Sequence, residues 1–372
     1  MSQTIEVPLA KKSRLMFIDM ARSIAILLML EGHFVDDSLM LEYRDTSNVI
    51  YATWLYIRGF TSPIFLTVTG LVFVYLLLFK RDEDYLTNLR VKKGFKRSIE
   101  LIFWGFMLQY YAFHVLQCIG VGIFTILVIF GLYKLVKVIP LWIYYFIAGI
   151  FLFGFNLYLD QLPNGQVWPE NAPYIIQNMF HGPGHRAIFP IVPWMGYTMF
   201  GAMFGCLLHD FKDQLTKWRT PLITLSIGLI LYIFPTDLMM LLNQVIGDFF
   251  VLDLWVLDWL FMRLGMVIIV LSILWLIEML LGDIKPNLFL KVGQNTLTIY
   301  IVHMIVLYGS LTGMGLNRLF RKSLGPWEVT IGAILFIAIF VIFVKYLDQI
   351  KAKLEFILGP IRRFFNRIYG IK

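Results

Sequence analysis

Long apolar stretches recur along the whole sequence and constrain the fold more than any other feature. Each is about twenty residues long, enough for an α-helix to cross roughly 30 Å of hydrocarbon. Strand-like alternation of apolar and polar residues is absent, so the class is helical. The sequence predicts an all-α polytopic transmembrane helix bundle of about ten helices. We place them at residues 15–35, 56–79, 96–116, 119–136, 139–159, 188–208, 220–242, 258–281, 293–312 and 327–347.

The composition is that of a chain whose surface faces lipid. Of its 372 residues, 59% are hydrophobic and only 15% are charged, whereas a soluble domain carries roughly a quarter charged residues. Phosphate-binding loops, zinc-protease helices and the nucleophile elbow are absent from the sequence. The common ATPases and hydrolases are therefore disfavoured.

The distribution of Lys and Arg predicts the orientation of the bundle. With ten helices, 24 of the 32 Lys and Arg residues fall on one side, six on the other and two within helices. Basic loops are cytoplasmic, so both termini are expected in the cytoplasm. The pI near 9.3 then reflects topology, and no nucleic-acid partner is expected. The expected parts are a cytoplasmic segment 1–14, a transmembrane domain 15–347 and a basic cytoplasmic tail 348–372, in a multi-pass protein of the cell (inner) membrane.

The first apolar segment carries ionisable residues, which cost several kcal/mol at membrane depth unless they are paired or functional. Asp19 and Arg22 are three residues apart and can pair, whereas Arg22 and His33 share a face about 16 Å apart. Asp37, four residues after His33, is placed to accept from one ring nitrogen and leave the other basic. His33 and Asp37 are therefore candidate catalytic residues, forming an oriented general base. The alternative is an interfacial ion pair and a structural histidine at the helix end.

The same segment resembles the first helix of the transmembrane acyltransferase superfamily. Its signature is an Asp, then an Arg, ten further residues and a His, which matches Asp19, Arg22 and His33. The form His-Phe-x-x-Asp is most similar to the branch that contains heparan-α-glucosaminide N-acetyltransferase. Three later motifs are also similar to this branch: Ser62-Pro63-Ile-Phe65-Leu-Thr-Val-Thr69-Gly70, Pro193-Trp194-Met-Gly196-Tyr197 followed by Gly201 and Gly205, and Gly293-Gln-Asn295-Thr-Leu-Thr-Ile-Tyr300-Ile-Val-His303. Ser23 and Thr69 depart from the family, which commonly has Gly and Ser there.

The resemblance implies an enzyme that moves an acyl group, most often acetyl, from cytosolic acyl-CoA to a hydroxyl or amine of an extracytoplasmic saccharide. His33 would be the catalytic base, and Arg22 with its neighbour Asp19 would contact the donor. Acetyl-CoA would be the donor substrate, and no metal is expected. The acceptor would be a glycan or glycolipid of the cell envelope at the lipid bilayer. A homodimer remains open as the assembly.

Two groups in the loops are further candidates for substrate binding. The basic loop from Lys80 to Arg97, with Lys92 and Lys93 as the candidate residues, could hold the phosphates of CoA, although inner loops are basic in any such protein. His181, His185 and Arg186 lie in the long outer loop and could contact the acceptor, the alternative being a plain loop. Since no third ligand is evident beside the two histidines, a metal site is not expected there.

Three residues within the motifs are also candidates for contact with the acceptor. Trp194 is implied by its place in the Pro-Trp-x-Gly motif. Asn295 and His303 are eight residues apart and lie nearly on one helix face. A packed polar pair is the alternative for these two residues.

A secondary transporter or flippase for a polar or lipid-linked substrate is the alternative function, because it too needs buried charges. Such transporters commonly have duplicated halves with matching interrupted helices. No such duplication is visible here, and the charged residues concentrate in one helix. The sequence therefore favours the enzyme.

Overall fold

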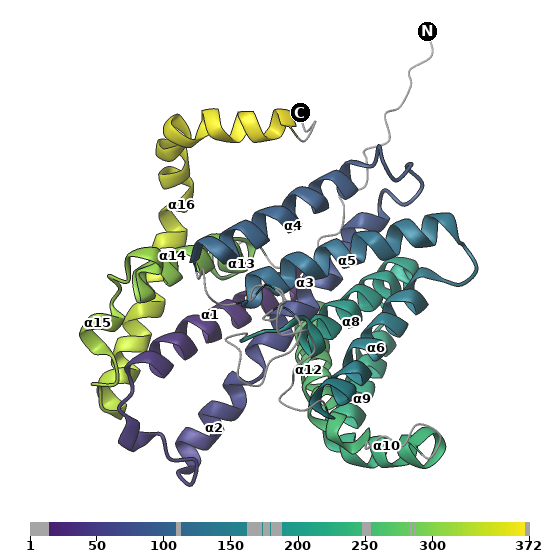
Figure 1. The fold of residues 1–372 in the computed structure, drawn as a ribbon, viewed down its shortest axis with the longest axis horizontal. Coiled ribbons are helices and arrows are strands. Elements are labelled where there is room, and N and C mark those ends of the chain that lie inside the picture. The colour runs from purple at the N-terminus through teal and green to yellow at the C-terminus, as the bar shows by residue number, and fades with distance from the viewer. Residues whose placement is uncertain are drawn as a thin grey trace.

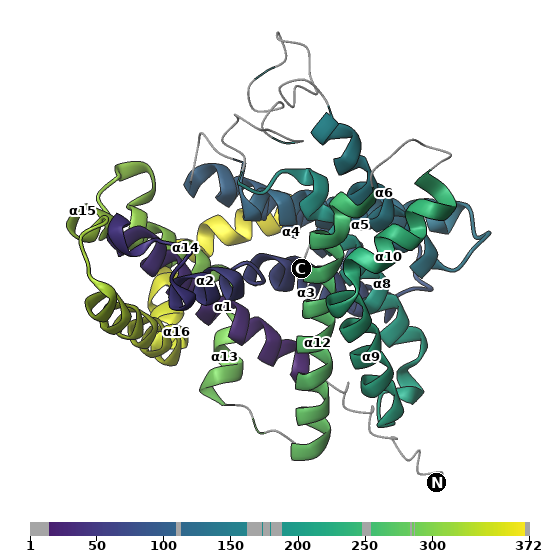
Figure 2. The same cartoon turned by 90° about the horizontal axis from the view of Figure 1, so that it is seen from below.

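The computed structural model describes residues 15–108, 113–161, 188–247, 254–282 and 287–368, together with residues 173, 179 and 285. These residues form helices and loops, with no strand among them. Helix α1 (Met16–Ser38) runs through the middle of the bundle (Figure 1). On one side it packs against α13, α14 and α16, and on the other against α3 and α12 (Figure 2).

The remaining helices follow in chain order. They are α2 Val49–Arg58, α3 Thr61–Leu78, α4 Leu89–Leu108, α5 Val115–Leu135, α6 Leu141–Gln161, α8 Ile191–Asp210, α9 Arg219–Ile233, α10 Pro235–Leu242, α12 Asp258–Leu281, α13 Leu288–Gln294, α14 Thr296–Tyr308, α15 Asn317–Phe320 and α16 Pro326–Ile368. Short 3₁₀ turns lie at Leu41–Tyr43, Lys212–Gln214, Leu254–Leu257 and Ser310–Thr312, and a π-helical turn lies at Asn243–Gly247.

Most of the long helices have the length and composition of membrane spans. Within the described part of the chain, six helices are long and apolar enough to cross a membrane, or eight if each of two bent pairs is one span. Helices α1 and α4 have 23 and 20 residues, but every stretch of 18 residues within them contains more than two charged residues. The all-helical, multi-pass class predicted from the sequence is thereby confirmed.

Two predicted helix starts were wrong because polar capping residues begin the helices earlier than the apolar stretches do. The second span starts at Val49 rather than 56, since the Asn48 side chain accepts from the N–H groups of Ile50 and Tyr51. The third helix starts at Leu89 rather than 96, after the capping side chain of Asn88.

Helix α5 also begins earlier than predicted, at Val115 rather than at residue 119. Its capping box joins His114 and Gln117. Residues 115 and 116 therefore belong to α5, although the sequence assigned them to the helix before it.

Three predicted helix ends or interiors also differ from the structure. Residues 220–242 form two helices bent by 79°, with Pro235 starting the second. The predicted helix 293–312 is divided between α13 and α14, which meet at Asn295 with a bend of 80°, and α14 ends at Tyr308. The last helix continues beyond residue 347 to Ile368.

Glycines allow α3 and α8 to pack with their backbones almost touching. A Cβ atom on Gly70 would lie 2.0 Å from the Thr198 carbonyl oxygen, and one on Gly201 would lie 1.9 Å from that of Thr67. Such small residues are typical of close helix pairs in membranes. The glycines of the Pro-Trp-x-Gly helix are therefore packing residues, and they fix α3 beside α8.

Ser23 plays the corresponding role between α1 and α13. Its hydroxyl donates to the Phe289 carbonyl oxygen at 2.6 Å and accepts from the Gly293 N–H at 2.9 Å. A Cβ atom on Gly293 would lie 2.3 Å from the Asp19 carbonyl oxygen. The departure from the family at Ser23 thus adds hydrogen bonds and keeps the approach close.

The contact of Gly201 gives a direct test of this packing. Gly201→Ala should destabilise the protein by about 1–3 kcal/mol, because the new methyl group overlaps a carbonyl oxygen of α3. Gly154→Ala is the matched control, since nothing lies within 4 Å of a Cβ atom there. Thermal unfolding of the detergent-purified variants measures the difference. Equal midpoints for the two variants would contradict the packing.

Candidate functional site

One cavity of about 610 Å³ runs along the centre of the bundle between α1, α3, α4, α5 and α14. Its lining on α3 extends from Thr61 to Leu76, which is about 22 Å of helix. At the Thr61 end the lining includes His33 and Arg58. At the other end α3 meets α4, where the Phe73 ring packs on Gly94. The cavity is therefore an elongated passage with chemically different ends.

Three cations of α4 line the passage at the α4 end. Arg90, Lys93 and Arg97 follow one another at intervals of three and four residues and so share one helix face. Of the two lysines proposed from the sequence for this role, Lys93 lines the cavity and Lys92 does not. Arg90 and Arg97 belong to the basic loop proposed for this role but were not singled out, although their spacing from Lys93 already indicated a common face.

Arg22 lines the passage between its two ends. Its Nη2 donates to Thr296 Oγ1 at 3.1 Å, and its Nη1 lies 3.9 Å from Asp19 Oδ1. The Asp19–Arg22 ion pair predicted from their spacing is thereby confirmed. Asp19 itself is buried beneath the arginine, at 6% exposure, and it does not line the cavity. Asp19 therefore pairs with Arg22 without lining the cavity itself.

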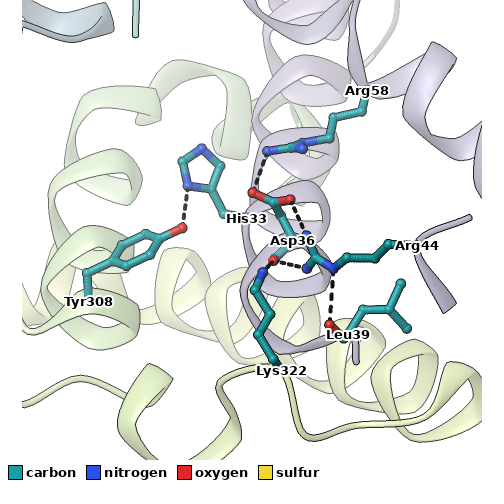
Figure 3. Close-up of polar contacts among 7 residues, drawn as sticks. All are labelled: His33, Asp36, Leu39, Arg44, Arg58, Tyr308 and Lys322. Atoms are coloured by element: carbon teal, nitrogen blue, oxygen red, sulfur yellow. Dashed lines mark hydrogen bonds and ion pairs between the residues drawn. The ribbon is translucent and has the colours of Figure 1, made fainter. Parts of the chain in front are cut away.

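His33 is hydrogen-bonded to a residue that the sequence did not suggest. Its Nδ1 lies 3.1 Å from the Tyr308 hydroxyl (Figure 3). The predicted hydrogen bond from His33 to Asp37 was wrong: Asp37 Oδ2 is buried and has no hydrogen-bond partner among the described residues. The physical reason is that α14 brings Tyr308 to the ring nitrogen from across the bundle.

Helices α1 and α14 run side by side in the same direction, and both contacts join these two helices. Arg22 and His33 are eleven residues apart on α1, and their partners Thr296 and Tyr308 are twelve apart on α14. The bend at Asn295 is what turns α14 alongside α1. Both polar contacts therefore depend on the same pair of helices.

Asp36, one turn after His33, collects three cations, as Figure 3 shows. Its carboxylate pairs with Arg44 Nη1 at 3.2 Å and with Arg58 Nη2 at 3.0 Å. Arg44 and Lys322 also donate to its backbone carbonyl oxygen. The sequence signal for this cluster was the separation of three residues from His33, which places both side chains toward one side of α1.

A short backbone ladder brings Lys322 into this cluster. The N–H of Lys322 donates to the Asp37 carbonyl oxygen, and that of Leu324 donates to the Ser38 carbonyl oxygen, each at 3.0 Å. Lys322 lies in the loop before α16, where partial burial and the nearby Arg44 lower its pKa, while Asp36 and Asp37 oppose this shift. The ladder thus places Lys322 beside Asp36, which lines this end of the passage.

Two of the other proposed binding residues, Trp194 and His303, contact residues that line the passage, and a third, Asn295, does not. His303 is fully buried, its ring centroid is 5.2 Å from that of His33, and its Nε2 has no hydrogen-bond partner among the described residues. Trp194 packs against Phe189, which lines the cavity, at 4.9 Å between ring centroids. Asn295 lies away from the passage, where its Oδ1 accepts from Lys351 at 2.9 Å.

The candidate residues of the outer loop lie outside the residues that the structure describes; they are His181, His185 and Arg186. Among the described residues, no group of three or more His, Cys, Asp or Glu side chains could hold a metal ion.

His114 lines the cavity as well and was not among the proposed site residues. Its Nε2 lies 3.0 Å from the Gly105 carbonyl oxygen, and its ring stacks on that of Tyr300 at 6.3 Å. Because the same ring caps α5, it connects the wall of the cavity to the start of a helix. No local pattern in the sequence indicated this position.

Comparison with known proteins identifies the family of the chain. No curated protein matches the sequence significantly. The protein-family profile described as the catalytic region of heparan-alpha-glucosaminide N-acetyltransferase matches residues 14–245. This range is well over half of the chain and includes Arg22, His33 and the basic face of α4. The resemblance seen in the motifs is thereby confirmed, and the chain belongs to the family of heparan-α-glucosaminide N-acetyltransferase catalytic domains.

Proposed function

We propose that this membrane acetyltransferase takes the acetyl group from acetyl-CoA at the cytoplasmic end of the passage and delivers it to a saccharide hydroxyl or amine at the other end. The observation that carries the proposal is the single cavity that joins the basic face of α4, Arg22 and His33. A donor phosphate and a general base are needed at opposite ends of such a reaction path. A saccharide of the cell envelope, at the inner membrane, is the proposed acceptor.

The phosphates of the donor bind Arg90, Lys93 and Arg97, because these three cations share one face of α4 and line the cavity. We call these three residues the basic rim. The pantetheine arm then extends past Arg22 toward His33, over about 16 Å of α1. The thioester lies next to His33 and the adenosine part stays at the basic rim. Arg22, already hydrogen-bonded to Thr296, is the polar contact along the apolar part of the path.

His33 accepts the proton of the acceptor. With Tyr308 accepting from Nδ1–H, the Nε2 lone pair is left to take the proton as the saccharide oxygen or nitrogen attacks the thioester carbonyl. The carbon–sulfur bond breaks, the acetyl group joins the saccharide, and the CoA thiolate takes up the proton from Nε2. Tyr308 therefore fixes the tautomer, a role that Asp37 was expected to have.

Asp37 has a different role in the proposed reaction. Its carboxylate lies one turn after His33, and Lys322 lies nearby on the loop before α16. It contributes charge to the acceptor end and does not orient the ring directly. Trp194 and His303 act through residues of the wall, Phe189 and His33.

The proposed base is tested by His33→Ala, which should lower acetyl transfer by about 10²–10⁴-fold, because no other group takes the proton. Tyr308→Phe should lower it by only about 3- to 10-fold, the worth of one hydrogen bond. Transfer of labelled acetyl from acetyl-CoA to glycans by purified protein is the assay. Labelled acetyl that crosses vesicles without joining a glycan would favour a transporter instead.

His209→Ala is the matched control for this experiment. His209 contacts Asp210 and Phe79, none of which lines the cavity among the described residues. Its variant should retain normal transfer. Normal transfer by His33→Ala at equal protein levels would end the assignment of the base.

Substitution of two adjacent lysines tests whether the basic rim binds the phosphates of the donor. Lys93→Gln should raise the KM for acetyl-CoA about fivefold with little change in kcat, since it removes one charge contact to phosphate. Lys92→Gln should leave the KM unchanged, because Lys92 does not line the cavity. Acetyl-pantetheine, which lacks the nucleotide phosphates of CoA, should show no difference between the two variants. Equal effects of both variants on acetyl-CoA would contradict the assignment.

The proposed orientation, with both termini in the cytoplasm, follows from the asymmetry of Lys and Arg. A cysteine placed at Glu170 should react with a membrane-impermeant thiol reagent added outside intact cells. One placed at Asp82, which is exposed, should react only after permeabilisation. The native cysteines Cys118 and Cys206 are buried, so background labelling stays low. The reverse pattern would invert the orientation and the proposed path.

A further inference from the structure

Arg263 is the one cation of helix α12, and the transfer reaction does not use it. It lies five residues after the start of this membrane span, about 7.5 Å along the helix. The other charged residues of the span, Asp258 and Glu278, lie near its two ends. Among the described residues, no carboxylate forms an ion pair with it and no acceptor hydrogen-bonds it; its contacts are with aromatic rings. An arginine so placed in a membrane protein costs free energy unless an anion compensates it.

Three elements hold the guanidinium in one place. Its Cζ lies 4.8 Å from the ring centroid of Trp259 on α12 and 6.0 Å from that of Trp194 on α8. Its Nη2 lies 3.5 Å from the position of a Cβ atom on Gly59, where α2 joins α3. Cation–π contact stabilises a cation and supplies no acceptor for its N–H groups. The guanidinium is therefore positioned by its neighbours while its donors remain available.

The depth of the cluster indicates which anion it meets. Trp194 and Trp259 lie in the first turns of α8 and α12, and tryptophans at helix ends are typical of the membrane interface. Lipid headgroups present phosphate at that level. The planar guanidinium forms two parallel hydrogen bonds to phosphate, which a lysine cannot do.

We propose that Arg263, Trp194 and Trp259 form a binding site for the phosphate of a membrane lipid, separate from the transfer cavity. None of the three lines that cavity among the described residues. The two sites are neighbours, because Trp194 packs on Phe189 of the cavity wall and Gly59 follows Arg58. A lipid bound at Arg263 thus has its headgroup beside the end of the passage that holds His33.

The site is tested with the full-length protein purified in dodecyl maltoside, a neutral detergent. The probe is radiolabelled dodecyl phosphate, which carries a phosphate on the same alkyl chain. Saturable binding is expected for the wild type, with a Kd about tenfold or more higher for Arg263→Gln, since a charge-assisted hydrogen-bonded pair is lost. Arg263→Lys should fall between them, because it keeps the charge without the planar fork.

Arg318→Gln is the matched control, because Arg318 is an exposed cation of α15, and it should bind like the wild type. An unchanged Kd for Arg263→Gln, or an equal loss in Arg318→Gln, would overturn the site. Should Arg263→Gln not yield monodisperse protein, an unchanged Kd for Arg263→Lys overturns it instead. Inorganic phosphate that displaces the probe as effectively as unlabelled dodecyl phosphate would overturn the assignment to a membrane lipid.

Discussion

Each ionised group inside an apolar helical bundle needs an opposite charge or a hydrogen bond, since burial without one costs several kcal/mol. The arrangement around α1 follows from this requirement. At its start, Glu278 of α12 accepts from the N–H groups of Met16 and Phe17 at 3.0 and 2.7 Å, which satisfies donors that a helix leaves free. At its other end, Asp36 draws in Arg44, Arg58 and Lys322. Polar contacts with distant segments thus hold α1 at both ends.

Small residues make these contacts geometrically possible. Ser23 and Gly293 let α13 approach α1 so closely that their backbones are hydrogen-bonded through one hydroxyl. The bend that follows α13 then directs α14 along α1. Thr296 and Tyr308 reach Arg22 and His33 as a result. The candidate site is therefore assembled by packing between segments nearly three hundred residues apart.

The charges of the molecule fall into two groups that have different consequences. Asp36 and Asp19 are matched within the fold, so they stabilise it and orient their neighbours. The basic face of α4 borders an open cavity, and Arg263 contacts aromatic rings in place of carboxylates. Of these cations, Arg97 also pairs with Glu100 at 3.2 Å. We propose that a ligand supplies the compensating charge for the others, which is why they are informative about function.

The sequence alone was sufficient for the class of fold and for two residues of the site. A membrane span must be about twenty apolar residues long, so apolar length identified most helices, and the separation of Arg22 from His33 placed them on one face. These are properties of a single helix. Helix starts at Asn48 and Asn88 were missed, because a capping side chain acts on a few local N–H groups that hydropathy does not register.

Only the tertiary structure decided which residues complete the site. Tyr308, rather than Asp37, meets the ring of His33, and Arg90 and Arg97 join Lys93 at the rim. Both outcomes depend on the directions in which α14 and α4 pass α1 and α3. Those directions are set by close contacts such as Gly293 on Ser23 and Phe73 on Gly94. Spacing along one helix determines which of its own residues share a face, whereas the partner of that face is chosen by packing between helices, which no local pattern encodes.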